Sequence, residues 1–234
     1  QHVSDEQVSQ EVVSWEGILL GNIADIQLPK PGFVQFITRT VCDFLVRIFC
    51  RCKSKGQENI PDEACIIVAN HRSALDGVFI TSQMRFFSAR KTFIFAKAKH
   101  WKSRFARFMA RKNNIILMDI NKNLTESLRQ MAAALRKGKK VIIFPEGMRS
   151  RDNRLHEFRD TFAILSRTLN VPIVPVAIEG SESAVYDNIA LPRFQNRVDV
   201  KFMKPIYPAG SKSAKVLKNR VFRLFKDALE TGKK

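Results

Sequence analysis

The sequence predicts an α/β fold in which helices flank a central mixed, largely parallel sheet. Two apolar runs, 65–69 and 141–145, each end in polar residues, as strands do where they leave a buried sheet. Between them, residues 115–118 have the composition of a strand, and residues 123–126 resemble a capping box that opens a helix ending at Gly138. A strand, a helix and a strand joined by short links form the crossover unit of a parallel sheet. At 234 residues, 45% of them hydrophobic, the chain is long enough for one sizeable core with an appendage.

Residues 1–32 are expected to form a linker or a docking arm. They begin polar, then carry the apolar residues Trp15 and 18–20, and end in the break at 29–32. No signal peptide is visible, and because the first residue is Gln1 rather than methionine, we expect the chain to be part of a longer protein.

Residues 33–52 are predicted to form an amphipathic helix that lies in a membrane interface. The segment is almost continuously apolar, but polar residues recur at every fourth position and would form one stripe on a helix: Gln35, Arg39, Asp43, Arg47 and Arg51. Each charge at the centre of a spanning helix costs about 2.5 to 3.5 kcal/mol, which argues against a transmembrane segment. The side chains expected to enter lipid are Phe33, Phe36, Ile37, Phe44, Ile48 and Phe49. The alternative is that these side chains pack on the domain as ordinary core.

Residues 53–234 are predicted to form one domain. Its elements follow in this order: polar connector 53–62, strand 65–69, helix 77–84, strand 92–96, helix 101–111, strand 115–118, helix 124–138, strand 141–145, helix 158–168, strand 173–178, strand 198–203 and helix 212–229. Residues 85–112 contain ten lysines and arginines and no acid, and the helix within them sets Trp101, Phe105 and Phe108 against a basic face. Such a helix suits a membrane surface or an acidic protein; a charged face over ordinary core is the alternative.

The net charge of +18 indicates an anionic partner. Nucleic acid, the face of an anionic membrane and an acidic carrier protein all qualify on charge alone. The four cysteines lack the paired spacing of zinc ligands, so we expect no metal site: Cys42, Cys50, Cys52 and Cys65. Free thiols in a reducing compartment are the simplest account of them.

The polar stretch 70–77, directly after the first apolar strand, is the first candidate site. An aspartate can hold a histidine in one tautomer, so His71 with Asp76 would form a base and its orienting partner. Four intervening residues leave room for one turn, on which both side chains can point the same way. The alternative is that Asn70 and Asp76 cap a turn and His71 is a surface residue. A second polar strand end, within 141–150, favours a site, because ligands bind outside the carboxyl ends of strands in open α/β sheets.

Together the two stretches resemble the glycerolipid acyltransferase family, whose members acylate glycerol phosphate and lysophospholipids. The shared patterns are Asn-His-x-Ser-x-x-Asp-Gly at 70–77 and Phe-Pro-Glu-Gly-x-Arg-Ser at 144–150. The family's proline-bearing apolar strand corresponds to 171–176. The resemblance covers roughly residues 55–205, implies the fold of that family, and makes 53–234 the acyltransferase domain.

This resemblance implies transfer of a fatty acyl group from a thioester, on acyl carrier protein (acyl-ACP) or coenzyme A (acyl-CoA), to the free hydroxyl of a lysophospholipid. The catalytic residues would be His71 and Asp76, with direct attack by the lipid hydroxyl because no Gly-x-Ser-x-Gly elbow surrounds Ser73. The substrate-binding residues would be Asn70, Ser73, Glu146, Gly147, Arg149 and Ser150. The planar guanidinium of Arg149 matches phosphate oxygens.

The resemblance also sets expectations for cofactors and location. No bound cofactor and no metal are required, because the acyl thioester is itself a substrate. The enzyme is expected on the cytoplasmic side of a membrane, as a peripheral or monotopic protein whose partner is an anionic membrane surface.

One departure from the family pattern lies between the two motifs. Members that act on phosphate monoesters usually carry a glycine and an arginine at the positions of Asn114 and Ile120. A missing cation favours a phosphodiester headgroup, as in lysophosphatidylethanolamine, although Lys122 is available to supply the charge. Residues 119–123 and 174–180 also resemble the acyltransferase part of the bifunctional 2-acylglycerophosphoethanolamine acyltransferase/acyl-carrier-protein synthetases.

Three other functions are compatible with parts of the sequence. One is 1-acylglycerol-3-phosphate acyltransferase activity, which makes phosphatidate. A basic nucleic-acid-binding module would explain the charge but neither motif, and its usual signatures are absent, so we expect no nucleic-acid partner. A non-catalytic membrane adaptor with the same fold is disfavoured by the intact His71 and Asp76.

Overall fold

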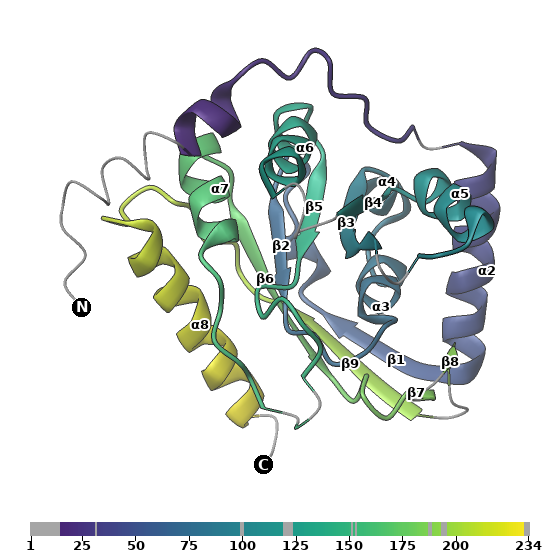
Figure 1. Ribbon diagram of the computed structural model, residues 1–234. Coiled ribbons are helices and arrows are strands. Elements are labelled where there is room, and N and C mark those ends of the chain that lie inside the picture. The colour runs from purple at the N-terminus through teal and green to yellow at the C-terminus, as the bar shows by residue number, and fades with distance from the viewer. Residues whose placement is uncertain are drawn as a thin grey trace.

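The computed structural model describes residues 15–30, 32–98, 101–118, 124–150, 152, 154–186, 189–192 and 196–231 (Figure 1). Its helices are α2 (Phe33–Phe49), α3 (Asp76–Ser82), α4 (Phe86–Arg90), α5 (Arg104–Lys112), α6 (Leu124–Arg136), α7 (Thr161–Leu169) and α8 (Ala214–Thr231), with a short helix at 15–20 before them. Its strands are β1 (Cys50–Lys55), β2 (Ile66–Ala69), β3 (Thr92–Lys97), β4 (Ile115–Met118), β5 (Lys140–Ile143), β6 (Ile173–Glu179), β7 (Val185–Tyr186), β8 (Ile189–Pro192) and β9 (Asn196–Phe202).

Seven of the described strands form one sheet in the order β1-β9-β6-β2-β5-β3-β4, and β7 pairs with β8 separately. Among the described residues, neighbouring strands of this sheet run parallel to each other, except that β6 and β9 are antiparallel. The predicted mixed, largely parallel sheet is therefore confirmed. The predicted crossover through α6 is also present, but β3 lies between β4 and β5, so the crossover passes over one strand.

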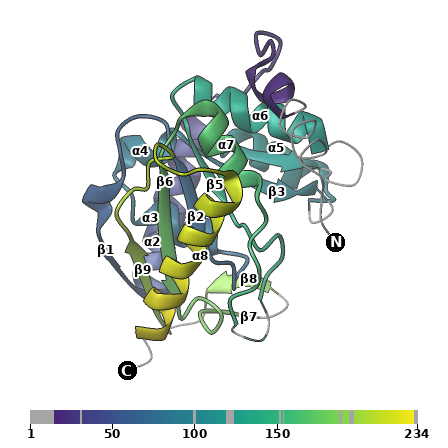
Figure 2. The same ribbon diagram turned by 90° about the vertical axis from the view of Figure 1, so that its left-hand side faces the viewer.

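The sheet separates two apolar cores. Successive residues of a strand point to opposite faces, so Ile66 and Val68 of β2 pack with α6, α7 and α8, whereas Ile67 and Ala69 pack with α2, α3 and α4. Figure 2 shows α8 lying across the first of these faces. Because β2, β5 and β6 are buried on both faces, their sequences are continuous apolar runs, which makes them recognisable.

The first strand corrects the predicted polar connector at 53–62. Cys50–Lys55 form β1, which pairs in parallel with β9 at the edge of the sheet. After the buried Cys50, exposed residues alternate with half-buried ones, and the exposed positions carry Arg51, Lys53 and Lys55. Charged side chains on an edge strand discourage pairing with other chains, and they also hide the strand from a hydrophobicity pattern. The preceding helix accordingly ends at Phe49 rather than at residue 52.

Helix α2 turns the first part of its polar stripe, Gln35, Arg39 and Asp43, toward the protein and its apolar side outward, whereas Arg47 is exposed. Gln35 is buried, and Arg39 donates from Nη2 to the carbonyl of Thr81 at 2.7 Å while lying 3.4 Å from Asp43. Val46 is 3% exposed and anchors the helix in the core, and Phe49 also packs there rather than facing outward. The exposed apolar side chains are Phe33, Phe36, Ile37, Val41, Phe44 and Ile48. No helix in the described ranges is long and apolar enough to cross a bilayer.

Residues 15–30 lie against the domain. Leu19 is fully buried in the core on the α6 side. Arg129 donates to the carbonyl of Asn22 and Lys137 to that of Ile26, at 2.8 and 2.9 Å. This part of the expected linker or docking arm is therefore attached to α6 by apolar and polar contacts.

The two sides of α2 should respond differently to truncation. Val46→Ala removes buried methyl groups and should lower the free energy of unfolding by about 1 to 3 kcal/mol. Phe44→Ala, on the exposed side of the same helix, should change it by less than about 0.5 kcal/mol. Urea unfolding of both variants measures the difference, and a larger loss for Phe44→Ala would show that the apolar side is part of the core.

Candidate active site

The turn between β2 and α3 holds His71 and Asp76 in contact. The Nδ1 atom of His71 lies 2.9 Å from Oδ2 of Asp76. The same oxygen accepts the N–H groups of Arg72 at 2.7 Å and Ser73 at 2.8 Å. Asp76 is fully buried, so its carboxylate depends on these donors, and they in turn fold the chain around it. The predicted pairing across one turn is what the structure contains.

The ring of His71 is also held by an aromatic neighbour. It stacks on the ring of Phe144, which follows β5, with centroids 4.2 Å apart and an interplanar angle of 22°. The His71 side chain is 21% exposed. Among the described residues none hydrogen-bonds to its Nε2 atom, which leaves that nitrogen available to a substrate.

The second motif holds the backbone of His71 from both sides. The His71 N–H donates to Glu146 Oε1 at 2.9 Å, and its carbonyl accepts the N–H of Ser150 at 2.8 Å. Glu146 is 6% exposed, and its Oε2 accepts the N–H of His156 at 3.0 Å. Both carboxylate oxygens of Glu146 are thus bonded to backbone groups. In this structure Glu146 joins the ends of two strands rather than projecting into open space.

Asn70 and Ser73 also shape the turn. The side-chain amide of Asn70 donates to the carbonyl of Ile178 and accepts the N–H of Ile178, both at 2.8 Å. These two bonds continue the pairing of β2 with β6 beyond the end of β2. Ser73 is 4% exposed, and its hydroxyl oxygen accepts the N–H of Leu75 at 3.3 Å. A serine buried in this way is not placed as an exposed nucleophile.

The turn after β5 carries the predicted phosphate-binding residues. Gly147 has a φ of +72°, and a Cβ at this position would lie 2.8 Å from Nε of Arg159, so the turn favours glycine. Arg149 is exposed on the same turn. Arg159 donates its N–H to the carbonyl of Pro145 at 3.0 Å and brings a second guanidinium to Gly147.

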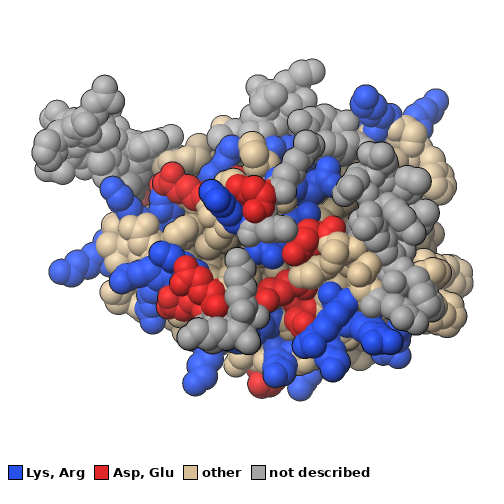
Figure 3. Space-filling model, turned by 90° about the horizontal axis from the view of Figure 1, so that it is seen from below, with Lys and Arg blue, Asp and Glu red and all other residues tan. Residues whose placement is uncertain are grey.

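Ser150 belongs to a hydrogen-bonded loop beside the site. Its Oγ lies 2.9 Å from Oδ1 of Asp152 and 2.8 Å from the carbonyl of Arg154. The Arg154 N–H and the Ser150 hydroxyl hold the pKa of Asp152 below its usual range. The carboxylate therefore stays ionised beside His156, whose Nε2 lies 3.1 Å away. Figure 3, which views the molecule from below Figure 1, shows acidic and basic side chains side by side on that face.

The structure reinterprets one departure from the family pattern. Asn114 is buried with a φ of +56°, in the left-handed region that glycine and asparagine adopt most readily. Its amide nitrogen also donates to the carbonyl of Arg90 at 2.8 Å. Asparagine therefore serves the same turn as glycine, and position 114 carries no information about phosphate binding. Ile120 and the candidate substrate residue Lys122 lie outside the described residues.

Three contacts at the site have no signal in the sequence. Phe144 belongs to the second motif, but its stacking on His71 depends on how β5 pairs with β2. Arg159 reaches Gly147 only because the loop before α7 returns to the strand end. Glu182 lies 3.4 Å from Arg72 because both follow neighbouring strands of the sheet.

This arrangement can activate a hydroxyl group. A histidine with one nitrogen on a buried carboxylate and the other open can accept a proton there. Arginines at the next strand end can bind phosphate oxygens beside it. The described site thus places an imidazole, a buried carboxylate and arginine side chains at neighbouring strand ends.

Comparison with known proteins supports the fold and the motifs. The sequence pattern described as Acyltransferase matches residues 51–179, which contain both motifs. The crystal structure of the 1-acyl-sn-glycerophosphate acyltransferase of Thermotoga maritima has a similar fold, with a TM-score of 0.69 over 96% of this chain and 97% of that one. The two sequences are 21% identical, so this likeness concerns the fold alone.

Curated relatives are similar over the same region. A chloroplastic 1-acyl-sn-glycerol-3-phosphate acyltransferase of Brassica napus is 29% identical over 187 residues, which are 77% of this chain and 52% of the relative. The 1-acyl-sn-glycerol-3-phosphate acyltransferase of Pseudomonas aeruginosa is 25% identical over 157 residues, 64% of this chain and 60% of the relative. The chain thus spans about half to three fifths of the length of these relatives.

The bonds of Glu146 predict a structural cost for its neutral counterpart. Glu146→Gln replaces one acceptor by an amide donor that faces a backbone N–H, and should lower the free energy of unfolding by about 1 to 3 kcal/mol. The matched control is Glu157→Gln, on the same loop, whose side chain is 91% exposed and should change stability by less than about 0.5 kcal/mol. Chemical denaturation compares them. A Glu146→Gln variant that is fully stable, yet has lost its affinity for the lipid acceptor, would make Glu146 a substrate ligand instead.

Proposed function

The chain belongs to the Acyltransferase family, and on that premise we propose that it transfers a fatty acyl group from an acyl thioester to the free hydroxyl of a lysophospholipid. The observation that carries the proposal is the contact of His71 with buried Asp76 at the end of β2, with Nε2 left open. A base in this position suits an alcohol substrate. The proposed reaction uses no metal and no bound cofactor, because the thioester donor already carries an activated acyl group.

The proposed chemistry is one direct displacement. With its Nδ1–H donated to Asp76, His71 accepts the acceptor's hydroxyl proton at Nε2 as the oxygen attacks the thioester carbonyl. Asp76 stabilises the imidazolium that forms. The carbon–sulfur bond then breaks, and the imidazolium returns the proton to the leaving thiolate. No acyl-enzyme intermediate is formed, in keeping with the buried hydroxyl of Ser73.

The remaining motif residues divide into two proposed roles. Asn70 and Glu146 position the catalytic turn, since their polar atoms are bonded to the backbone of Ile178, His71 and His156. Arg149 binds the acceptor's phosphate, for which its exposed guanidinium is suited.

The relatives favour 1-acylglycerol 3-phosphate as the acceptor, since the Brassica napus and Pseudomonas aeruginosa proteins are both named for it. Arg159 beside Gly147 provides a second cation for a phosphate monoester. Ile120 in place of the family's arginine favours a second candidate, a lysophospholipid with a headgroup on its phosphate. A panel of acceptors with and without a headgroup, assayed with acyl-ACP and acyl-CoA, separates these candidates and identifies the donor.

We also propose that α2, α4 and α5 bind the membrane from which the acceptor comes. These helices lie on one side of the molecule (Figure 1). Their exposed aromatic side chains include Phe33, Phe36 and Phe44 of α2, Phe87 of α4, and Phe105 and Phe108 of α5. Helix α5 adds basic residues, and residues 85–112 contain no acid. Exposed aromatics supply insertion energy, and the cations are attracted to anionic lipid.

Removal of the base should abolish most of the turnover. His71→Ala should lower kcat by about two to four powers of ten, the usual worth of a positioned general base. The matched control is His156→Ala, whose exposed imidazole pairs with Asp152 in the neighbouring loop and should keep kcat within about threefold. Steady-state assays with a short-chain, soluble acceptor measure both. Equal activity of the His71 variant and the wild type would end the proposed mechanism.

Membrane binding should depend on the outward side of α2. Phe36→Ser with Phe44→Ser removes two side chains whose burial in lipid is worth about 1.5 to 3 kcal/mol each. Salt-resistant sedimentation with anionic vesicles should therefore weaken by at least about tenfold, and activity should fall more on vesicles than on a soluble acceptor. The matched control is Val216→Ser with Leu224→Ser, two exposed apolar residues of α8 on the opposite side of the sheet. If the α8 variant loses binding and the α2 variant does not, the membrane face has been assigned to the wrong side.

A further inference from the structure

A cavity of about 300 Å³ lies beside the candidate active site, on the face of the sheet that α8 covers. Three separate segments contribute its cations, and apolar side chains complete the lining: Arg72, Arg154 and Lys226 with Leu155, Phe222 and Leu229. Glu230 also lines the cavity. The cavity thus combines positive charge with an apolar surface.

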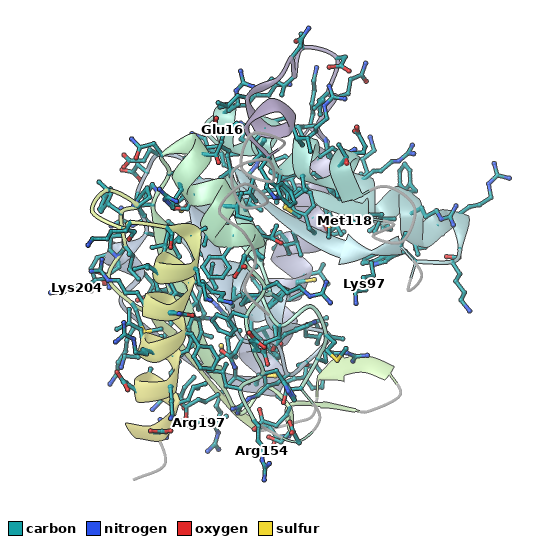
Figure 4. All side chains as sticks on the ribbon, turned by 60° about the vertical axis from the view of Figure 1, so that its left-hand side comes forward. Glu16, Lys97, Met118, Arg154, Arg197 and Lys204 are labelled. Carbon is teal, nitrogen blue, oxygen red and sulfur yellow. The ribbon has the colours of Figure 1, made fainter. Side chains whose placement is uncertain are left out.

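One of the cations, Arg72, belongs to the catalytic turn, and a second, Arg154, contacts the second motif through its backbone. Arg72 follows His71 in the chain, and its N–H donates to Asp76. Its guanidinium is held by Glu182 at 3.4 Å, and its side chain is 10% exposed. The carbonyl of Arg154 accepts from the hydroxyl of Ser150. In Figure 4, Arg154 lies at the lower end of the molecule, near the last turns of α8.

The side chains of His71 and Arg72 lie on opposite faces of the sheet. The ring of His71 stacks on Phe144, which packs against the core on the α2 and α3 side. Arg72 instead lines the cavity together with residues of α8. Figure 1 shows α8 and α2 separated by the sheet. The cavity therefore lies on the side of the sheet opposite the proposed membrane face.

We propose that this cavity binds the phosphate of the phosphopantetheine arm that acyl-CoA and acyl-ACP share, an inference that rests on the proposed function. The acceptor comes from the membrane, whereas both donors come from water, so the two substrates reach His71 from different sides. The extended pantetheine arm separates this phosphate from the thioester, and a phosphate site must accordingly lie at some distance from His71. The cations suit the phosphate, and Leu155, Phe222 and Leu229 suit the aliphatic part of the arm.

The ion pairs around the cavity leave positive charge with which the phosphate of this ligand can interact. Lys226 lies 4.0 Å from Glu230, but both side chains are more than 60% exposed, and such surface pairs contribute little. A phosphate can displace a partner of that kind. Arg72 keeps its pairing with Glu182 and adds positive charge to the part of the cavity lining that is close to Asp76.

Direct binding tests the site without requiring catalysis. Isothermal titration with 4′-phosphopantetheine, with pantetheine as the uncharged comparison, should show that the phosphate strengthens binding. Arg154→Gln with Lys226→Gln should raise the Kd for 4′-phosphopantetheine by about tenfold and leave pantetheine unchanged. The matched control is Lys215→Gln with Arg220→Gln, which removes two charges from the exposed surface of α8 outside the cavity and should change neither Kd more than about twofold.

Kinetics then identify the source of the arm. The cavity variant should raise the KM for the donor by about tenfold and leave the KM for the lipid acceptor unchanged. A rise with acyl-CoA, with acyl-ACP or with both supports the proposal and names the donor in use. An unchanged donor KM with each carrier, or a rise confined to the acceptor KM, overturns it.

The two proposals fail in different ways. If wild-type protein transfers acyl groups but the cavity variant binds 4′-phosphopantetheine as tightly as wild type does, only the cavity assignment is wrong. If the phosphate-dependent binding is present but no lysophospholipid is acylated, the proposed function is wrong and the cavity assignment stands. Circular dichroism and thermal unfolding confirm that each variant is folded before these results are compared.

Discussion

The candidate site depends on the hydrogen bonds that hold His71 on both sides of its backbone. The N–H bonds to Glu146 and the carbonyl to the N–H of Ser150, so that one strand end is fastened to the next. Asp76 then fixes the imidazole from within the turn. A parallel sheet supplies the necessary geometry, because it brings the carboxyl ends of β2 and β5 side by side. Two motifs about 70 residues apart in the sequence act as one site for this reason.

The same sheet divides the surroundings of the site into two sides. Helix α2 presents aromatic side chains to the outside while Gln35 and Arg39 face the protein, the reverse of a helix on a water-facing surface. On the opposite side, α8, the loop before α7 and Arg72 line an open cationic cavity. A reaction between a membrane lipid and a water-soluble thioester needs access from both phases, and the proposed roles of the two sides meet that need.

The sequence predicts the fold best where burial is complete. Strands β2, β5 and β6 are apolar on both faces, and the pairing of His71 with Asp76 follows from local spacing. The sequence-based prediction misses strand β1 because the exposed positions of the strand carry charges. Its backbone pairing with β9 also has no effect on the pattern of apolar and polar side chains. The bonds of Glu146 and the approach of Arg159 to Gly147 join segments that only the tertiary fold brings together. At Asn114 the error is of the opposite kind, because the family pattern suggests a difference in substrate binding that the structure does not support. The residue is an asparagine in a left-handed turn, where the family has glycine.

The central claim is that Asp76 acts through His71 as one catalytic unit. A double-mutant cycle of His71→Ala and Asp76→Asn, measured as kcat with a saturating thioester and a soluble acceptor, tests it most directly. If the two residues form one unit, Asp76→Asn should be severe alone but should cost less than about threefold in the His71→Ala background. Full additivity of the two losses on the logarithmic scale would show that Asp76 contributes independently of His71 and would contradict the account.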